Sequence, residues 1–141
     1  MNEILSLKNA AVVVTGATGF IGSHLIDYLV GYGCTIHALV RETSDRRWLN
    51  KSDQVKIHVV DLEQSSPISC LEKADYLFHC AGLTKAKTRD DYFCGNVYSC
   101  EVLYERCVAI GSNLKAIVHL SSLAAAGPSM RGEAAQEKNP C

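Results

Sequence analysis

Three glycines at steps of three residues, Gly16, Gly19 and Gly22, directly follow an apolar run in the segment VVVTGATGFIGSHL. Glycine in ordered structure costs backbone entropy, so three of them here predict a tight turn between a buried strand and a helix. Gly16 permits the turn, Gly19 lets backbone N–H groups approach a pyrophosphate, and Gly22 lets the helix pack near the sheet. Because the free N–H groups and the positive dipole end of that helix then face an anion, the pattern predicts a dinucleotide site.

Short apolar runs recur along the chain and alternate with helical patterns or long connections. The expected strands are Ala10–Thr15, Cys34–Val40, Gln54–Leu62, Ala74–Gly82 and Leu114–Ser122. The expected helices are one from Phe20 to Gly31 or Gly33, one from about Asp90 to about Ile110, and a short one in residues 43–51 capped by Thr43 or Ser44. This alternation predicts an α/β fold with a Rossmann-type doubly wound parallel sheet, and right-handed crossovers give the strand order 3-2-1-4-5.

Composition narrows the class of protein. The 141 residues carry 14 basic and 15 acidic side chains, a net charge of −1, so they give no electrostatic case for nucleic acid or an anionic membrane surface. No run of 18 apolar residues and no signal peptide is present, which predicts a cytoplasmic protein without a membrane partner. The seven cysteines match no zinc-binding spacing and are expected to be reduced, so no metal site is predicted.

The ordered motifs resemble the extended short-chain dehydrogenase/reductases, the NAD(P)-dependent epimerase/dehydratase family. VTGATGFIGSHL is similar to the cofactor turn of that family, and VVDL, FHCAG, NVYSCEVLYE and VHLSSLAAAG are similar, in register, to its later motifs. The turn and the resemblance together imply cofactor contacts from Gly16, Thr18, Gly19, Phe20, Ile21, Gly22, Asp61, Leu62, Ala81 and Gly82. Asn96 is similar to a family asparagine that supports the site from a helix. The interpretation of Asn96 as an ordinary polar residue of a helix is equally consistent with the sequence.

The end of the second expected strand bears on the choice of cofactor. NAD enzymes of this fold carry an acidic residue there. In this chain that position is occupied by Val40, and the next residue is Arg41. A guanidinium suits the oxygens of a 2′-phosphate, and Arg46 and Arg47 are near in sequence. NADP is therefore favoured over NAD, the alternative being that Arg41 is a solvated residue at a strand end.

The family resemblance also implies a catalytic serine, tyrosine and lysine, with the serine at Ser122. No Tyr-x-x-x-Lys follows, because all six tyrosines precede Ser122. We therefore expect residues 1–141 to be one dinucleotide-binding domain, incomplete at its C-terminus and cut before the later strands and the substrate domain. Without a positioned acid/base about 10²–10⁴ in rate is lost, so the chain is expected to bind a dinucleotide without turnover.

The resemblance implies hydride transfer at a secondary alcohol or ketone in the parent protein, most commonly of a nucleotide sugar. The small residues Ala125, Ala126 and Gly127 replace the VYG of sugar epimerases and are more similar to NADP-dependent ketone reductases resembling dihydroflavonol reductase. A non-catalytic dinucleotide-binding sensor and a decayed coding sequence remain alternatives. In a sheet that lacks its later strands, the fifth strand would present an open edge or an apolar face, which predicts self-association into a homo-oligomer or a helix missing from one face.

Overall fold

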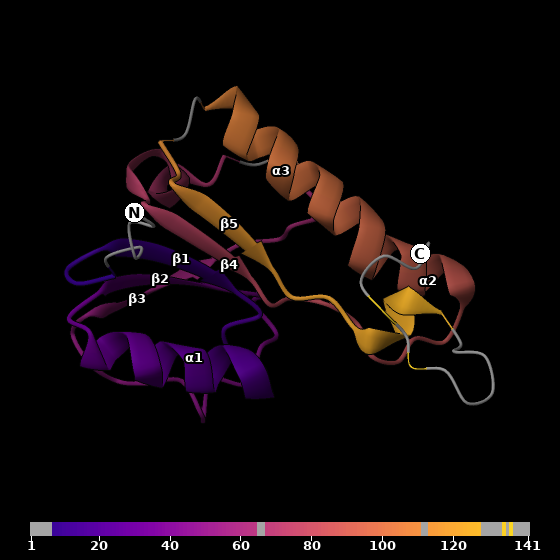
Figure 1. The fold of residues 1–141 in the computed structure, drawn as a ribbon, viewed down its shortest axis with the longest axis horizontal. Helices are drawn as coiled ribbons and strands as arrows, with labels where there is room; N and C mark the ends of the chain where they lie inside the picture. Colours follow the sequence, from indigo (N-terminus) through magenta and orange to yellow (C-terminus); the bar gives the residue numbers. More distant parts are fainter. Residues whose placement is uncertain (1–6, 65–66, 111–112, 128–133, 135, 137–141) are drawn as a thin grey trace.

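A single parallel sheet forms the centre of the molecule. The computed structural model describes residues 7–64, 67–110, 113–127, 134 and 136. Its strands are β1 (Ala11–Thr15), β2 (Thr35–Val40), β3 (Val55–Val59), β4 (Tyr76–His79) and β5 (Ala116–His119). They pair in the order β3-β2-β1-β4-β5 (Figure 1), which confirms the predicted fold class and strand order.

Helices cover the two faces of this sheet. On one face lies α1 (Phe20–Gly31), and on the other lie the consecutive segments α2 (Arg89–Phe93), η2 (Cys94–Tyr98, a π-helix) and α3 (Ser99–Ala109) (Figure 1). The central strand β1 is apolar on both sides because alternate residues enter different cores: Val12 packs on the α1 side and Val13 on the α3 side. This double burial explains the uninterrupted apolar run before the glycine turn.

The predicted long helix is confirmed as the segments α2, η2 and α3, with one irregular turn in the middle. Thr88 caps its start in a capping box with Asp91. The π-helix of η2 contains Gly95, where a Cβ atom would lie 2.7 Å from Leu83 Cγ. The absence of a side chain at Gly95 therefore lets the helix pack closely against the loop that follows β4.

The short helix expected in residues 43–51 was wrong, because this connection consists of turns. The Ser44 N–H donates to the Arg41 carbonyl at 3.0 Å, while Ser44 Oγ accepts from the Arg41 N–H at 3.0 Å. The Arg47 N–H donates to Asp45 Oδ1 at 3.0 Å. These local side-chain bonds compete with helical ones, and Leu49 alone is buried from this stretch, so no apolar face holds a helix on the sheet.

Other differences concern short elements and strand ends. The strands are one to several residues shorter than expected, since the flanking residues enter loops. Two 3₁₀ helices were not expected, η1 (Ser69–Lys73) before β4 and η3 (Leu123–Ala126) after β5. Within the described ranges, no helix has the length and apolar character needed to cross a membrane.

Candidate dinucleotide-binding site

The N-terminus of α1 is built by the glycine turn. Gly16 adopts a φ of +63°, a conformation that favours glycine, and its carbonyl accepts from the Gly19 N–H at 2.9 Å. Gly19 is the N-cap residue of α1, no side chain caps this end, and its first turn holds no acidic residue. The first N–H groups of α1 and the positive end of its dipole are therefore available to an anion.

Backbone-to-backbone contact explains why two of these positions must be glycine. A Cβ atom on Gly16 would lie 2.6 Å from Ala81 N and 2.7 Å from the Cys80 carbonyl oxygen. A Cβ atom on Gly22 would overlap the Gly16 carbonyl oxygen. The turn after β1, the start of α1 and the loop after β4 thus touch through their main chains, with no room for side chains.

A cleft of about 160 Å³ opens at the carboxyl ends of the parallel strands, between β1 and β4, where the order in which successive strands are added to the sheet changes direction. Its lining residues are Gly16, Thr18, Leu39, Val40, Arg41, Ser44, Val60, Leu62, Ala81, Gly82 and Leu83. A second hollow of about 400 Å³ shares Arg41 and Val60 with it and is also lined by Asp61. In open α/β sheets, ligands bind in this crevice.

The cleft brings together six residues that the sequence nominated as cofactor contacts: Gly16, Thr18, Arg41, Leu62, Ala81 and Gly82. Asp61 lies in the adjoining hollow. Gly19 and Gly22 shape the turn without lining the cleft, and Phe20 and Ile21 stand exposed on the first turn of α1. Five further lining residues were not nominated from the sequence: Leu39, Val40, Ser44, Val60 and Leu83. The signal that could have found them is their position near the carboxyl ends of strands β2, β3 and β4.

Asn96 and Ser122 lie outside the cleft lining. Asn96 Oδ1 accepts from the Leu83 N–H at 2.8 Å, and its Nδ2 donates to the Leu83 carbonyl at 3.1 Å. This amide therefore holds the loop whose residues form one wall of the cleft. Ser122 is exposed after β5, and its Oγ accepts from the Ala124 N–H at 3.2 Å, which caps η3.

The comparison with known families agrees with this geometry. The model of the "NAD dependent epimerase/dehydratase family" matches residues 12–141. The chain belongs to this family. Residues 12–141 include the glycine turn, all five carboxyl-terminal strand ends and the residues that line the cleft.

This epimerase/dehydratase family member aligns with only part of the length of each relative named here. A "Ceramide reductase" of Caulobacter vibrioides is 32% identical over 128 residues, which are 90% of this chain and 39% of that protein. A "Bifunctional dihydroflavonol 4-reductase/flavanone 4-reductase" of Pyrus communis is 38% identical over 68 residues, 48% of this chain and 18% of that protein. The structure of "MoeE5 in complex with UDP-glucuronic acid and NAD" superposes with a TM-score of 0.71 and 31% identity, over 85% of this chain and 39% of that one.

In this family member, Arg41 borders both the cleft and the adjoining hollow. The Arg41–Ser44 turn fixes the backbone at the end of β2. Neither neighbouring arginine lines these spaces: Arg47 pairs with Asp45, which lowers the pKa of that carboxyl, and Arg46 lines a separate hollow. Of the three arginines, Arg41 is therefore the one placed to meet a group in the cleft.

A buried chain of hydrogen bonds supports the floor of the site and was not foreseen from the sequence. The Ala81 N–H donates to Thr15 Oγ1 at 3.1 Å, and Thr15 Oγ1 lies 2.6 Å from His79 Nδ1. His79 Nε2 lies 3.0 Å from Cys100 Sγ, which donates to the Asn96 carbonyl at 2.9 Å. All four bonds are satisfied together when His79 is neutral with its proton on Nε2. Burial, followed by the effect of His119, lowers the pKa of His79 to about 4, which favours this state.

Proposed function

We propose that the chain binds a dinucleotide in this cleft as the cofactor-binding portion of an NAD(P)-dependent epimerase, dehydratase or reductase. The observation that carries the proposal is the uncapped N-terminus of α1 beside a backbone-lined cleft at the carboxyl edge of the sheet. A pyrophosphate suits this place because backbone N–H groups and the helix dipole recognise anions without a side chain. When bound, the nicotinamide of such a cofactor supplies hydride transfer.

The residues divide between the two halves of the cofactor. We assign the pyrophosphate to the glycine turn, comprising Gly16, Thr18, Gly19, Phe20, Ile21 and Gly22. The adenosine end goes to the residues after β2 and β3, which are Arg41, Asp61 and Leu62. Ala81 and Gly82 face the cofactor from the loop after β4, and Asn96 acts by holding that loop.

Arg41 carries the proposed preference for NADP over NAD. The Arg41→Gln variant is expected to bind NADPH about ten- to a hundredfold more weakly, because a charge-assisted hydrogen bond to the 2′-phosphate is lost. NADH binding should stay nearly constant. Titration of both nucleotides by fluorescence measures this, with Arg46→Gln as the matched control outside the cleft. An equal loss of affinity for NADPH and NADH would contradict the assignment of Arg41 to the 2′-phosphate.

The parent reaction is proposed as hydride transfer at a secondary alcohol or ketone. A nucleotide-sugar substrate is supported by the likeness to the complex of MoeE5 with UDP-glucuronic acid. A ketone substrate is the second candidate, favoured by the small residues Ala125, Ala126 and Gly127 and by the two reductase relatives. The chain spans about two-fifths or less of the length of these two curated relatives, so the substrate of the whole protein is a proposal.

We expect the 141-residue chain alone to show no turnover. No Tyr-x-x-x-Lys follows Ser122, so the proposed catalytic serine has no acid/base partner of the family type in this sequence. The measurement is oxidation of NADPH and NADH with panels of ketones and UDP-sugars, against a blank without protein. Steady turnover above the blank would contradict this expectation. Tight binding without turnover also fits the alternative of a dinucleotide sensor.

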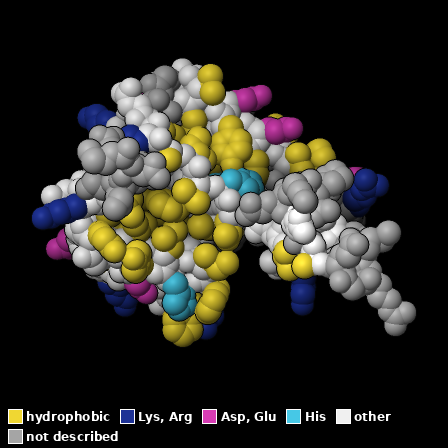
Figure 2. Space-filling model, viewed as in Figure 1, with side chains coloured by type: hydrophobic (Ala, Val, Ile, Leu, Met, Phe, Trp, Pro, Cys, Tyr) yellow, Lys and Arg dark blue, Asp and Glu magenta, His cyan; other side chains and the backbone are white. Residues whose placement is uncertain are grey.

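The open edge of the sheet supports the proposed self-association. Figure 2 shows hydrophobic side chains gathered over the sheet on the side that carries β5. Ile117, Val118 and Leu120 are each 43–47% exposed there. Sedimentation velocity is expected to show concentration-dependent association that Val118→Lys weakens, because a charge on an edge strand opposes pairing. Val108→Lys, on α3, is the matched control and should associate like the wild type. A monomer at all concentrations would contradict the proposal.

We also propose a cytoplasmic location. The six cysteines among the described residues are free thiols, Cys34, Cys70, Cys80, Cys94, Cys100 and Cys107. Free thiols in such number fit a reducing compartment.

A further inference from the structure

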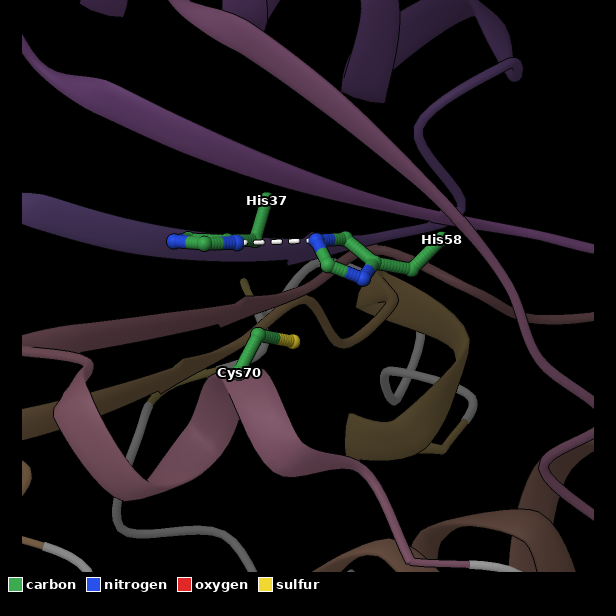
Figure 3. Close-up of side chains that lie close together, drawn as sticks. All are labelled: His37, His58 and Cys70. Atoms are coloured by element: carbon green, nitrogen blue, oxygen red, sulfur yellow. Dashed lines mark hydrogen bonds between the residues drawn. The ribbon is translucent and has the colours of Figure 1, made fainter.

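Two histidines and one cysteine, from three separate elements, meet on the face of the sheet opposite α1. His37 on β2 and His58 on β3 point to the same side as Leu39, which packs with η1 and α3 residues. His37 Nδ1 lies 2.8 Å from His58 Nε2, and the ring centroids are 5.0 Å apart. Cys70 of η1 lies beside the two rings (Figure 3), and one donor atom from each residue lies within 4.8 Å of the others.

The contact between the two imidazoles shows that at least one ring nitrogen in it carries no proton. His37 Nδ1 and His58 Nε2 are within hydrogen-bond distance, and a hydrogen bond between two ring nitrogens needs one donor and one free lone pair. One ring nitrogen then donates its proton to the lone pair of the other. Among the described residues, no other hydrogen bond holds either ring. A cation between the rings would take the place of that proton, which would move to the other nitrogen of the donating ring, and would accept a lone pair from each imidazole.

The donor set also selects a class of cation. Two imidazole nitrogens and one sulfur suit Zn²⁺ and similar divalent ions, which bind nitrogen at about 2.0–2.1 Å and sulfur at about 2.3 Å. Burial raises the pKa of the Cys70 thiol to about 11, so binding must displace its proton, as a coordinating cation does. Side-chain rotation would have to bring these three donors around one ion, and a tetrahedral site would leave one position for a further ligand.

We propose that His37, His58 and Cys70 form a binding site for a zinc-type divalent cation. The site is separate from the dinucleotide cleft, although His58 pairs in register with Leu39, which lines that cleft. The proposal does not depend on the proposed function. None of these residues is among those that the sequence nominated for any site, because no local spacing unites positions on β2, β3 and η1.

A second cluster with the same residue types provides a built-in comparison. His79, Cys100 and His119 also place three donor atoms within 4.8 Å of one another. Their donors already have partners, however: the Cys100 thiol donates to the Asn96 carbonyl, and His119 Nδ1 lies 2.5 Å from the Tyr104 hydroxyl. A cation there would break bonds that support the floor of the cleft, so the structure favours the first cluster.

The test is a Co²⁺ titration of the reduced, chelator-treated 141-residue chain, followed by absorption spectroscopy and then by competition with Zn²⁺. One equivalent of Co²⁺ is expected to give a four-coordinate visible spectrum and a thiolate-to-cobalt charge-transfer band. His58→Gln and Cys70→Ser are expected to weaken binding by at least about 10–100-fold, and Cys70→Ser also removes the charge-transfer band. The matched controls Cys100→Ser and His119→Gln should keep both the affinity and the band.

Two results would overturn the assignment. A charge-transfer band that survives in Cys70→Ser and disappears in Cys100→Ser would move the ion to the second cluster. A titration without any saturable spectral change would exclude a site of this kind at either cluster. Circular dichroism checks folding of each variant, and if Cys70→Ser does not fold, the half-buried His58→Gln on the edge strand decides the matter by its affinity.

Discussion

Gly22→Ala is expected to destabilise the chain and to abolish dinucleotide binding, whereas Gly31→Ala, the same substitution at the other end of α1, is expected to stabilise it. The difference lies in what an added methyl group meets. At Gly22 it would overlap the Gly16 carbonyl oxygen and lie 2.8 Å from the Gly16 carbonyl carbon. At Gly31 it would meet no heavy atom within 4 Å.

The expected magnitudes follow from these contacts. Separating the start of α1 from the turn after β1 costs about 1–3 kcal/mol of unfolding free energy, because both partners are main-chain atoms that cannot move alone. The same shift moves the N–H groups proposed to bind the pyrophosphate, so NADPH affinity should fall by at least about a hundredfold. Gly31→Ala should instead raise the unfolding free energy by about 0.4–1 kcal/mol, since alanine restricts the unfolded chain.

Denaturant unfolding and a nucleotide titration on both variants measure these effects. Wild-type NADPH affinity in Gly31→Ala shows that α1 itself tolerates the substitution. Normal binding by a folded Gly22→Ala chain would count against the close approach of helix and turn as the basis of the site. Loss of stability without loss of binding would separate the packing role of Gly22 from the proposed cofactor role.

The sequence was most informative where burial and chain geometry act together. The run before Gly16 had to be a strand buried on both faces, and each later strand was reached by a connection long enough for a parallel crossover. Strand order followed from the handedness of those crossovers. The position of the cleft agrees with the sequence as well, because the glycine turn expected after the first strand supplies two of its lining residues, Gly16 and Thr18.

Residues 43–51 show where local reasoning fails. Thr43 and Ser44 are good helix caps in isolation, but a cap stabilises only a helix that can bury a face. Trp48 of this segment is 71% exposed, and Leu49 is held by a turn in which its N–H donates to the Arg46 carbonyl. How little of the sheet this connection covers depends on tertiary packing, which local residue preferences do not report.

Contacts between distant positions could not be predicted from one sequence. Thr15 and His79 are 64 residues apart and meet only because β1 and β4 pair in that register. The same holds for His37 and His58 on β2 and β3. The sequence showed His79 only as part of the FHCAG motif; the structure adds a buried side chain that links the end of β1 to α3, while Thr15 also holds the loop after β4.

His79 makes the stability of the fold sensitive to pH. The free energy of unfolding is expected to fall by about 2–3 kcal/mol as the pH is lowered from about 6.5 to about 4. Burial, with a further contribution from His119, lowers the pKa of His79 from the usual 6.5 to about 4. In this window the unfolded chain therefore takes up a proton that the native chain does not, and protonation favours unfolding. Above pH 6.5 both states are neutral, so the full contribution of His79 is present there.

Other groups act in the same direction and define the control. The pKa values of His37 and His58 are also lowered, so these rings add to the loss of stability as the pH falls. Asp75, whose pKa is lowered by the partner Lys115 and the Ala11 N–H, loses its contribution only below its usual value of 3.8. The window above pH 4 therefore reports mainly on histidines.

Denaturant unfolding at a series of pH values tests this account on three chains. His79→Gln should lower stability at pH 7, because Thr15 and Cys100 lose their partner, and should also flatten the decline between pH 6.5 and 4. His24→Gln, on the exposed side of α1, is the matched control and should decline like the wild type. An equally steep decline in His79→Gln would mean that another group drives the acid sensitivity. A shallower decline of the unfolding free energy in His79→Gln would show that the fold depends on the imidazole of His79 staying neutral between β1 and α3.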